Sequence, residues 1–112
     1  MNYLKIVKPD DWHVHFREGE LLELLVPETS KIYNRAIVMP NLIKPIQTEK
    51  SAVLYKNEIL KYSRNNREFN PLMTLYLSEY IKIDELVNGF KNNNIFAAKL
   101  YPAGATTNSS KG

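Results

Sequence analysis

The sequence has 112 residues, a length that suits one modest domain and is too short for a complete eight-stranded β/α barrel, which typically needs about 250 residues. Hydrophobic residues make up 44% of it and aromatic residues 11%, which excludes a disordered segment, and the absence of cysteine excludes disulfides and thiolate metal sites. The formal net charge of +3 comes from cations scattered among acids without a basic stripe, which argues against a nucleic-acid partner.

Short apolar runs alternate along the chain with longer periodic segments, as is typical of β-α units. The first predicted strand covers residues 12–16, in which apolar and ionisable residues alternate. One face is apolar and carries Trp12, Val14 and Phe16, and the other is ionisable and carries His13, His15 and, just beyond the strand, Arg17. A helix should follow over residues 21–25. Pro27 is expected to interrupt it and to open a new turn over residues 29–33.

The second predicted strand, residues 36–39, is wholly apolar, as expected of a parallel strand covered on both faces, and Pro40 ends it. The strongest helix signal covers residues 48–62, because Thr48 can cap its start and Glu49 lies in its favourable first turn. One face of this helix carries the residues expected to enter the core, namely Ala52, Tyr55, Ile59 and Tyr62.

The third predicted strand covers residues 71–77, and Asp84 is expected to cap the helix that follows it. This helix has apolar residues at staple and core spacing, namely Ile83, Leu86, Val87 and Phe90. The asparagines at 92–94 should end it. A fourth strand is predicted over residues 95–100, and the polar residues 102–112 indicate a loop.

The pattern therefore predicts an α/β fold with about four parallel strands and three helical segments joined by right-handed crossovers. Two architectures fit it: a small open sheet covered on both faces, or the amino-terminal half of an eight-stranded β/α barrel. In both, ligands bind beyond the carboxyl ends of the strands. Polar residues from several strands lie at such ends, which favours the barrel: His13, His15, Arg17, Asn41, Lys99, Thr106 and Thr107.

His13 and His15 are the chain's two histidines, and alternate residues of a strand project from the same face. Two neutral imidazoles presented together are suitable ligands for zinc. The spacing alone is equally compatible with two histidines that are partly exposed or hydrogen-bonded within the sheet.

Arg17 lies just beyond the histidines and can pair bidentately with the carboxylate of a small acidic substrate, although a surface salt bridge with Glu18 or Glu20 is an alternative. Asn41 could orient a polar ligand or could simply form a turn after the second strand.

Lys99 stands in an almost wholly apolar run, which would make a buried ammonium costly. Its side chain can extend to solvent at the strand end, pair with a charge, or lose its proton and become a nucleophile or a site of covalent modification. The catalytic alternative predicts a perturbed lysine close to His13 and His15.

Other common catalytic signatures are missing, including a phosphate-binding glycine loop, a dinucleotide fingerprint and a nucleophile elbow. The sequence also shows no signal-peptide core and no apolar run of membrane-spanning length. We therefore expect a cytoplasmic protein without a membrane partner.

Three long motifs in family order, residues 9–17, 36–42 and 97–103 with 105–110, resemble the dihydroorotases of the shorter bacterial type, class II. This family belongs to the amidohydrolase superfamily of metal-dependent β/α barrels. The resemblance implies reversible interconversion of N-carbamoyl-L-aspartate and L-dihydroorotate in de novo pyrimidine biosynthesis. It also implies two zinc ions per active site, with His13 and His15 binding the more buried ion and a carboxylated Lys99 bridging both.

By the same resemblance, Arg17 and Asn41 would hold the substrate carboxylate, and Thr106 and Thr107 would lie on a loop that closes over the substrate. The remaining histidine ligands and the catalytic aspartate of the family match no residue here and are expected beyond Gly112, so no catalytic residue is assigned within 1–112. The resemblance further implies that the full-length protein is a homodimer.

We therefore expect residues 1–112 to be the amino-terminal part of a single metal-dependent barrel whose remainder is absent, and to be inactive alone. The alternatives are a non-catalytic α/β module that binds anions through Arg17 and Asn41, and an inactive folding fragment.

Overall fold

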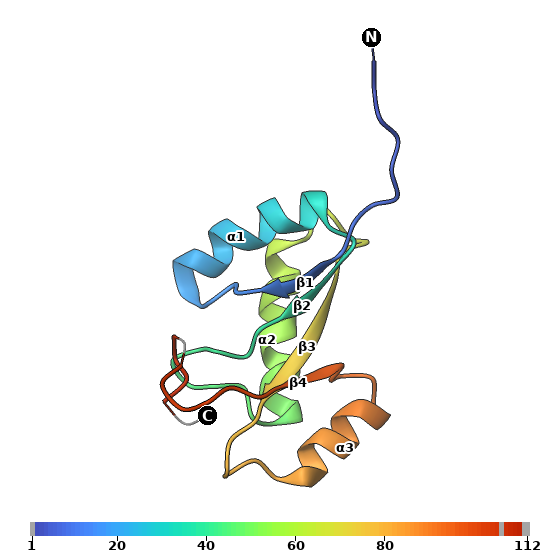
Figure 1. Cartoon of the computed structure of the whole chain (residues 1–112). Helices are drawn as coiled ribbons and strands as arrows, with labels where there is room; N and C mark the ends of the chain where they lie inside the picture. The colour runs from blue at the N-terminus through green and yellow to red at the C-terminus, as the bar shows by residue number, and fades with distance from the viewer. Residues whose placement is uncertain (1, 106, 111–112) are drawn as a thin grey trace.

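The computed structural model describes residues 2–105 and 107–110, in which strands and helices alternate as the sequence predicts (Figure 1). In chain order the elements are β1 (Asp11–Val14), α1 (Gly19–Ile32), β2 (Arg35–Val38), α2 (Glu49–Tyr62), β3 (Asn70–Tyr76), α3 (Ile83–Lys91) and β4 (Ala97–Lys99). The first and last strands are shorter than predicted, so His15 follows β1 instead of lying within it.

The four strands form one parallel sheet in the order β1-β2-β3-β4. The register pairs Val14 with Val38, Val38 with Met73, and Tyr76 with Lys99. Helix α1 contacts α2, and α2 contacts α3. A doubly wound open sheet reverses its strand order at a switch point, whereas a barrel adds each strand beside the previous one. The observed order is that of a half-barrel, and the open-sheet alternative is not the fold of this chain.

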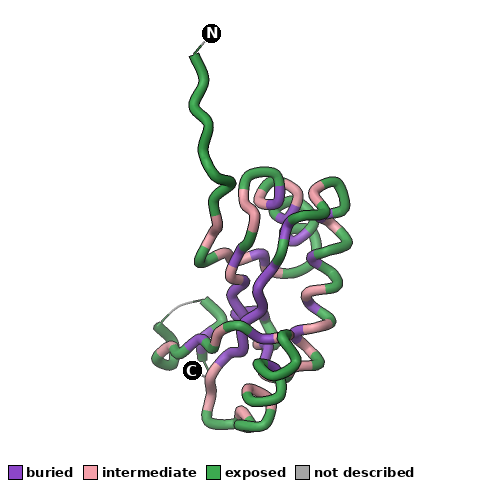
Figure 2. The backbone as a smooth tube through the Cα atoms, turned by 90° about the vertical axis from the view of Figure 1, so that its right-hand side faces the viewer, coloured by how far each residue is buried: buried purple, intermediate pink, exposed green. Residues whose placement is uncertain are grey.

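The hydrophobic core lies between the sheet and the helices, and Figure 2 shows the buried backbone running through the centre of the molecule. Helix α2 begins after Thr48, whose hydroxyl accepts a hydrogen bond from the Ser51 amide at 3.1 Å, so the predicted cap is confirmed. The predicted inner face of α2 is also confirmed: Ala52, Tyr55 and Ile59 are buried, and Tyr62 packs partly against the core.

Helix α1 is continuous through Pro27, so the predicted interruption at this residue is wrong. The proline lacks the amide that would bond to Glu23, which is exposed. Leu22, Val26 and Ser30 are all buried and spaced four residues apart, so they form one inner stripe on both sides of the proline. Packing of this stripe against the core outweighs the loss of one backbone hydrogen bond.

Helix α3 differs from its prediction at its start and on its apolar face. Lys82, and not Asp84, occupies the capping position, and Asp84 lies in the first turn, where its carboxylate still interacts favourably with the helix dipole. Ile83 and Phe90 are 75% and 47% exposed, so most of the expected core face does not enter the core; Leu86 packs partly against it. Buried Gly89 instead makes the close approach, to the side chain of Ile95.

Within the described part of the chain, no helix is both long enough and apolar enough to cross a membrane.

Candidate functional site

The two histidines lie at the carboxyl end of β1, with their Nε2 atoms 3.1 Å apart and their ring planes tilted by 54°. Partial burial lowers the pKa of His15 to about 4, and the positive charges of Arg17 and Lys99 act in the same direction. His15 is therefore neutral at pH 7, the form in which imidazole binds metals. The structure brings the His-x-His pair together as metal chemistry requires.

Lys99 lies at the end of β4 and is only 9% exposed, so its side chain does not extend into solvent. Its Nζ donates a hydrogen bond to Oδ1 of Asn41 at 2.6 Å and lies 4.9 Å from the ring centroid of Tyr101. Burial lowers the pKa of Lys99, and the charge of Arg17 lowers it further. Because the charge of Lys99 also acts on His15, the perturbed lysine shares one site with the histidine pair.

Arg17 follows β1 in a left-handed backbone conformation, with φ of 57°. Its Nη1 donates to the carbonyl oxygen of Asn41 at 2.9 Å, and its own carbonyl accepts a hydrogen bond from the Tyr55 hydroxyl at 2.7 Å. The alternative of a salt bridge with Glu18 or Glu20 is absent from the described residues. The Glu18 carboxylate accepts a hydrogen bond from the Ile43 amide instead.

Asn41 is the centre of the site and is 1% exposed. Its side chain accepts from Lys99 and donates to the carbonyl oxygen of Thr107 at 3.4 Å. Its backbone carbonyl accepts from Arg17 and, at 3.2 Å, from the side-chain amide of Asn108. Asn41 therefore joins the ends of β1, β2 and β4 to Thr107 and Asn108, which is more than a turn-forming role.

Of the two predicted loop threonines, Thr107 contacts the site through its backbone carbonyl, and Thr106 lies outside the described residues. The sequence interpretation missed Asn108, which adds a second loop contact to Asn41, and it assigned Tyr55 only to the core. A residue on the inner face of a helix gives no sequence signal that its hydroxyl reaches a loop.

Two hydroxyls of β3 were also missed, those of Thr74 and Tyr76. Both are buried, and neither has a hydrogen-bond partner among the residues that the structure describes. The register places Thr74 beside Ala97 and Tyr76 beside Lys99, and paired residues of parallel strands point to the same face. The face that carries Lys99 therefore continues onto β3 with polar groups. Their alternate spacing in the sequence is the signal that could have revealed them.

Residues 2–105 and 107–110 contain no group of three or more His, Cys, Asp or Glu side chains arranged to hold a metal ion. The histidine pair supplies two nitrogen ligands, and Lys99 is the nearby group that could become a third after modification. Gly112 itself lies outside the described residues, and the expectation that the catalytic aspartate follows it stays a prediction.

The chain is similar to dihydroorotases in sequence and in structure, although no protein-family model matches it. Dihydroorotases from Salmonella heidelberg and Salmonella arizonae are each 55% identical over 109 residues, which is 97% of this chain and 31% of each relative. A crystal structure of dihydroorotase from Saccharomyces cerevisiae, in complex with 5-fluoroorotic acid, matches with a TM-score of 0.84 and 36% identity over 93% of this chain and 28% of that one. A crystal structure of dihydroorotase from Campylobacter jejuni matches with a TM-score of 0.84 and 40% identity, and the match covers 94% of this chain and 30% of that one.

These matches confirm the resemblance indicated by the three sequence motifs. The chain spans just under a third of the length of the curated relatives it matches.

Proposed function

We propose that this chain is part of a zinc-dependent dihydroorotase, a hydrolase that interconverts N-carbamoyl-L-aspartate and L-dihydroorotate in de novo pyrimidine biosynthesis. The observation that carries the proposal is the joining of Lys99, Asn41 and Arg17 beside a histidine pair in a half-barrel that is similar to dihydroorotases over nearly its whole length. The proposal extends to a cytoplasmic, homodimeric full-length protein.

The histidine pair fits a zinc ion. Zinc binds imidazole nitrogens at about 2.0–2.1 Å in tetrahedral geometry, so two such ligands lie roughly 3.3 Å apart. The Nε2 atoms of His13 and His15 are 3.1 Å apart, and the low pKa of His15 leaves its nitrogen available to a metal near neutral pH. When bound, the metal ions would polarise the amide carbonyl of the substrate and activate water.

Lys99 suits the bridging role because its amine is buried and its pKa is lowered, which increases the fraction of the neutral form. A neutral amine can attack carbon dioxide, forming an N–C bond and releasing one proton, and the product is a carbamate anion. This change replaces a buried cation with anionic oxygen ligands, which is the type of group that two zinc ions require. Asn41 holds the Lys99 amine in place at the end of β4.

Arg17 and Asn41 are proposed to bind the substrate carboxylate, and Thr106 and Thr107 are proposed to lie on a substrate-binding loop that closes over the substrate. Arg17 presents a planar cation whose Nη1 is fixed by the Asn41 carbonyl, and a fixed guanidinium recognises a carboxylate with high geometric specificity. The ligand of the yeast structure, 5-fluoroorotic acid, carries such a carboxylate on a pyrimidine ring. The proton-transferring aspartate belongs, in this proposal, to a part of the barrel outside this chain.

The test uses the full-length protein and measures bound zinc and the cyclisation of N-carbamoyl-L-aspartate. We expect His13→Ala and Lys99→Ala to lower the zinc content and to reduce kcat/KM at least about 100-fold, since each removes a metal ligand. Lys50→Ala, which removes an exposed lysine from α2, is the matched control and should have the zinc content and kcat/KM of the wild type.

A full-length protein without bound metal whose cyclisation rate survives both substitutions would contradict the proposal. Binding of 5-fluoroorotate in the absence of zinc and of any turnover would favour the anion-binding module. The molecular mass of the full-length protein in solution tests the proposed homodimer, which should have twice the mass of one chain.

A further inference from the structure

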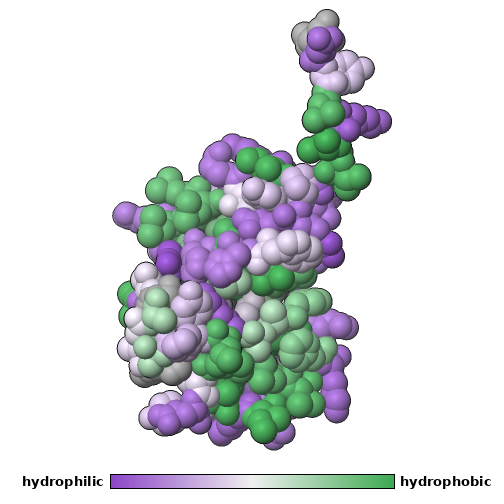
Figure 3. All heavy atoms as spheres, in the orientation of Figure 1, coloured by the Kyte–Doolittle hydropathy of each residue, from purple (hydrophilic) through white to green (hydrophobic). Residues whose placement is uncertain are grey.

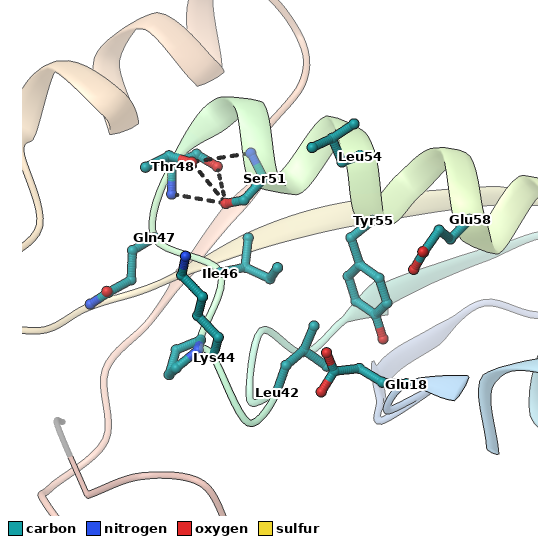
Figure 4. A pocket seen from close by; sticks show the side chains of 11 residues that line it. Glu18, Leu42, Lys44, Ile46, Gln47, Thr48, Ser51, Leu54, Tyr55 and Glu58 are labelled. Atoms are coloured by element: carbon teal, nitrogen blue, oxygen red, sulfur yellow. Dashed lines mark hydrogen bonds between the residues drawn. The ribbon is translucent and has the colours of Figure 1, made fainter. Parts of the chain in front are cut away.

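Tyr55 connects helix α2 to the backbone of the site from behind the sheet. Its side chain is 4% exposed, and its hydroxyl donates to the Arg17 carbonyl at 2.7 Å across 38 residues of sequence. Figure 4 shows Tyr55 reaching from α2 toward the segments that carry Glu18 and Leu42, where it lines a pocket of about 360 Å³. The hydroxyl therefore contacts the backbone of a site residue without entering the site.

Arg17 is a residue whose backbone needs support. Its φ of 57° is in the left-handed region, a backbone conformation that residues other than glycine and asparagine rarely adopt. A conformation of this kind persists when surrounding contacts hold it in place. Here the Tyr55 hydroxyl holds the carbonyl of Arg17, and the Asn41 carbonyl holds its guanidinium at 2.9 Å. Arg17 is thus fixed at its backbone and at its side-chain end by two separate elements.

The Tyr55 hydroxyl is suited to a permanent donor role. Burial raises the pKa of Tyr55, with the Glu18 and Glu58 carboxylates acting in the same direction, so the phenol stays protonated at every physiological pH. The same turn is also tied to the 42–46 loop, because the Glu18 carboxylate accepts from the Ile43 amide at 3.2 Å. Removal of the Tyr55 hydroxyl would leave the carbonyl of Arg17 without this partner, while the Glu18 contact would remain.

We infer that Tyr55 is a positioning residue, which sets the direction of the Arg17 guanidinium and thereby the affinity of the site for a carboxylate. This inference rests on the proposed function, because it assigns the Arg17 cation to the substrate carboxylate. It adds a residue on the helix side of the sheet to a site otherwise built at the strand ends. The role is to hold Arg17 in place, and Tyr55 touches neither the substrate nor a metal.

The first experiment compares Tyr55→Phe with Tyr62→Phe in the full-length protein. Both changes remove one hydroxyl from α2, and the Tyr62 hydroxyl makes no hydrogen bond to any described residue. We expect Tyr55→Phe to raise the KM for N-carbamoyl-L-aspartate and the Kd for 5-fluoroorotate about 3- to 10-fold, the effect of one lost hydrogen bond, with kcat within twofold. Tyr62→Phe should leave all three values unchanged.

A second experiment separates positioning from a general loosening of the fold. In an Arg17→Ala background the guanidinium is gone, so Tyr55→Phe should add no further loss, whereas a merely structural effect would multiply with that of Arg17→Ala. Crystal structures of the two tyrosine variants give a readout that needs no activity. The Arg17 guanidinium should leave the Asn41 carbonyl in Tyr55→Phe and stay on it in Tyr62→Phe.

The inference is overturned if Arg17 keeps its place in Tyr55→Phe, if kcat falls while KM stays the same, or if the two substitutions multiply. These results concern Tyr55 alone. Failure of the wild-type protein to cyclise N-carbamoyl-L-aspartate contradicts the proposed function instead, and in that case the position of Arg17 in the two crystal structures still decides what Tyr55 holds.

Discussion

The carboxyl end of the sheet and the α3 edge of the molecule are built in opposite ways. At the carboxyl end, Asn41 joins residues distant in sequence through four hydrogen bonds and is almost completely buried. At the α3 edge, apolar side chains such as Ile83 and Phe90 are exposed, and Figure 3 shows hydrophobic residues gathered on the lower part of the molecule, where α3 lies in Figure 1. Polar contacts between distant residues specify the site, whereas at the α3 edge apolar side chains remain exposed in the described part of the chain.

The largest expected effect comes from breaking the polar centre. Asn41→Ala removes the acceptor of the buried Lys99 amine and the donor to the loop, so we expect kcat/KM of the full-length protein to fall about 100-fold or more and bound zinc to decrease. Steady-state cyclisation assays and metal analysis measure both. Asn65→Ala, at an exposed asparagine, is the control. Activity within threefold of the wild type would show that Asn41 is not the centre of the site.

The next largest effect is expected at the contact between α3 and Ile95, where the α3 edge is packed. A Cβ added at Gly89 would overlap Cγ1 of Ile95, which is 1% exposed, so Gly89→Ala must displace a buried side chain. We expect a loss of about 1–3 kcal/mol in the free energy of unfolding, measured by urea denaturation. The neighbouring exposed position, Asn88→Ala, should be neutral or slightly stabilising. Equal free energies of unfolding for the two variants would mean that α3 does not pack closely against Ile95 at Gly89.

A smaller effect concerns the pH dependence of the site. The pKa of His15 is about 4 in the folded chain and near 6.5 when unfolded, so the unfolded state binds more protons between these values. The contribution of His15 to stability is complete above pH 6.5 and is lost as the pH falls toward 4. Because the imidazole is partly exposed and screened by solvent, we expect a loss of about 1 kcal/mol.

Urea denaturation at a series of pH values, with a chelator present to remove bound metal, measures this loss. His15→Gln should flatten the pH dependence between pH 6.5 and 4 relative to the wild type. Parallel pH profiles for the two proteins would contradict the lowered pKa of His15.

The smallest expected effect is at the exposed face of α3. Ile83 is 75% exposed, so Ile83→Gln should change the free energy of unfolding by less than about 0.5 kcal/mol. Phe16→Leu, at a core residue that is completely buried, provides the contrast and should cost more than about 1 kcal/mol. A loss of more than about 1 kcal/mol for Ile83→Gln in the full-length protein would show that another part of that protein covers this face.

The fold was predictable where periodicity and packing agree. The apolar second strand and the amphipathic α2 each gave one consistent pattern, and both are present. The prediction was wrong at Pro27, because the local preference of one residue was outweighed by a buried stripe that only the tertiary structure completes. The strand pattern assigned Trp12 to the apolar face of β1 but gave no indication that it is 56% exposed and packs its ring beneath the Arg35 guanidinium.

The site residues were predictable by type and strand position, but their connections were not. Spacing placed His13 and His15 on one side of a strand end, and the structure adds that their nitrogens meet. Nothing in the spacing indicated that Arg17 binds the backbone of Asn41 and not its side chain, or that Tyr55 supports Arg17 from α2. Such contacts depend on loop conformations, including a left-handed Arg17, that no local pattern specifies.

The simple strand order has a consequence for how the molecule forms. Each strand pairs with the one that directly precedes it in the chain, so each strand pairing closes a shorter loop than the contact between Asn41 and Lys99 does. We expect the β1-β2-β3 layer to assemble early during synthesis on the ribosome. The contact between Asn41 and Lys99 spans 58 residues and would then form last, on a scaffold that is already in place.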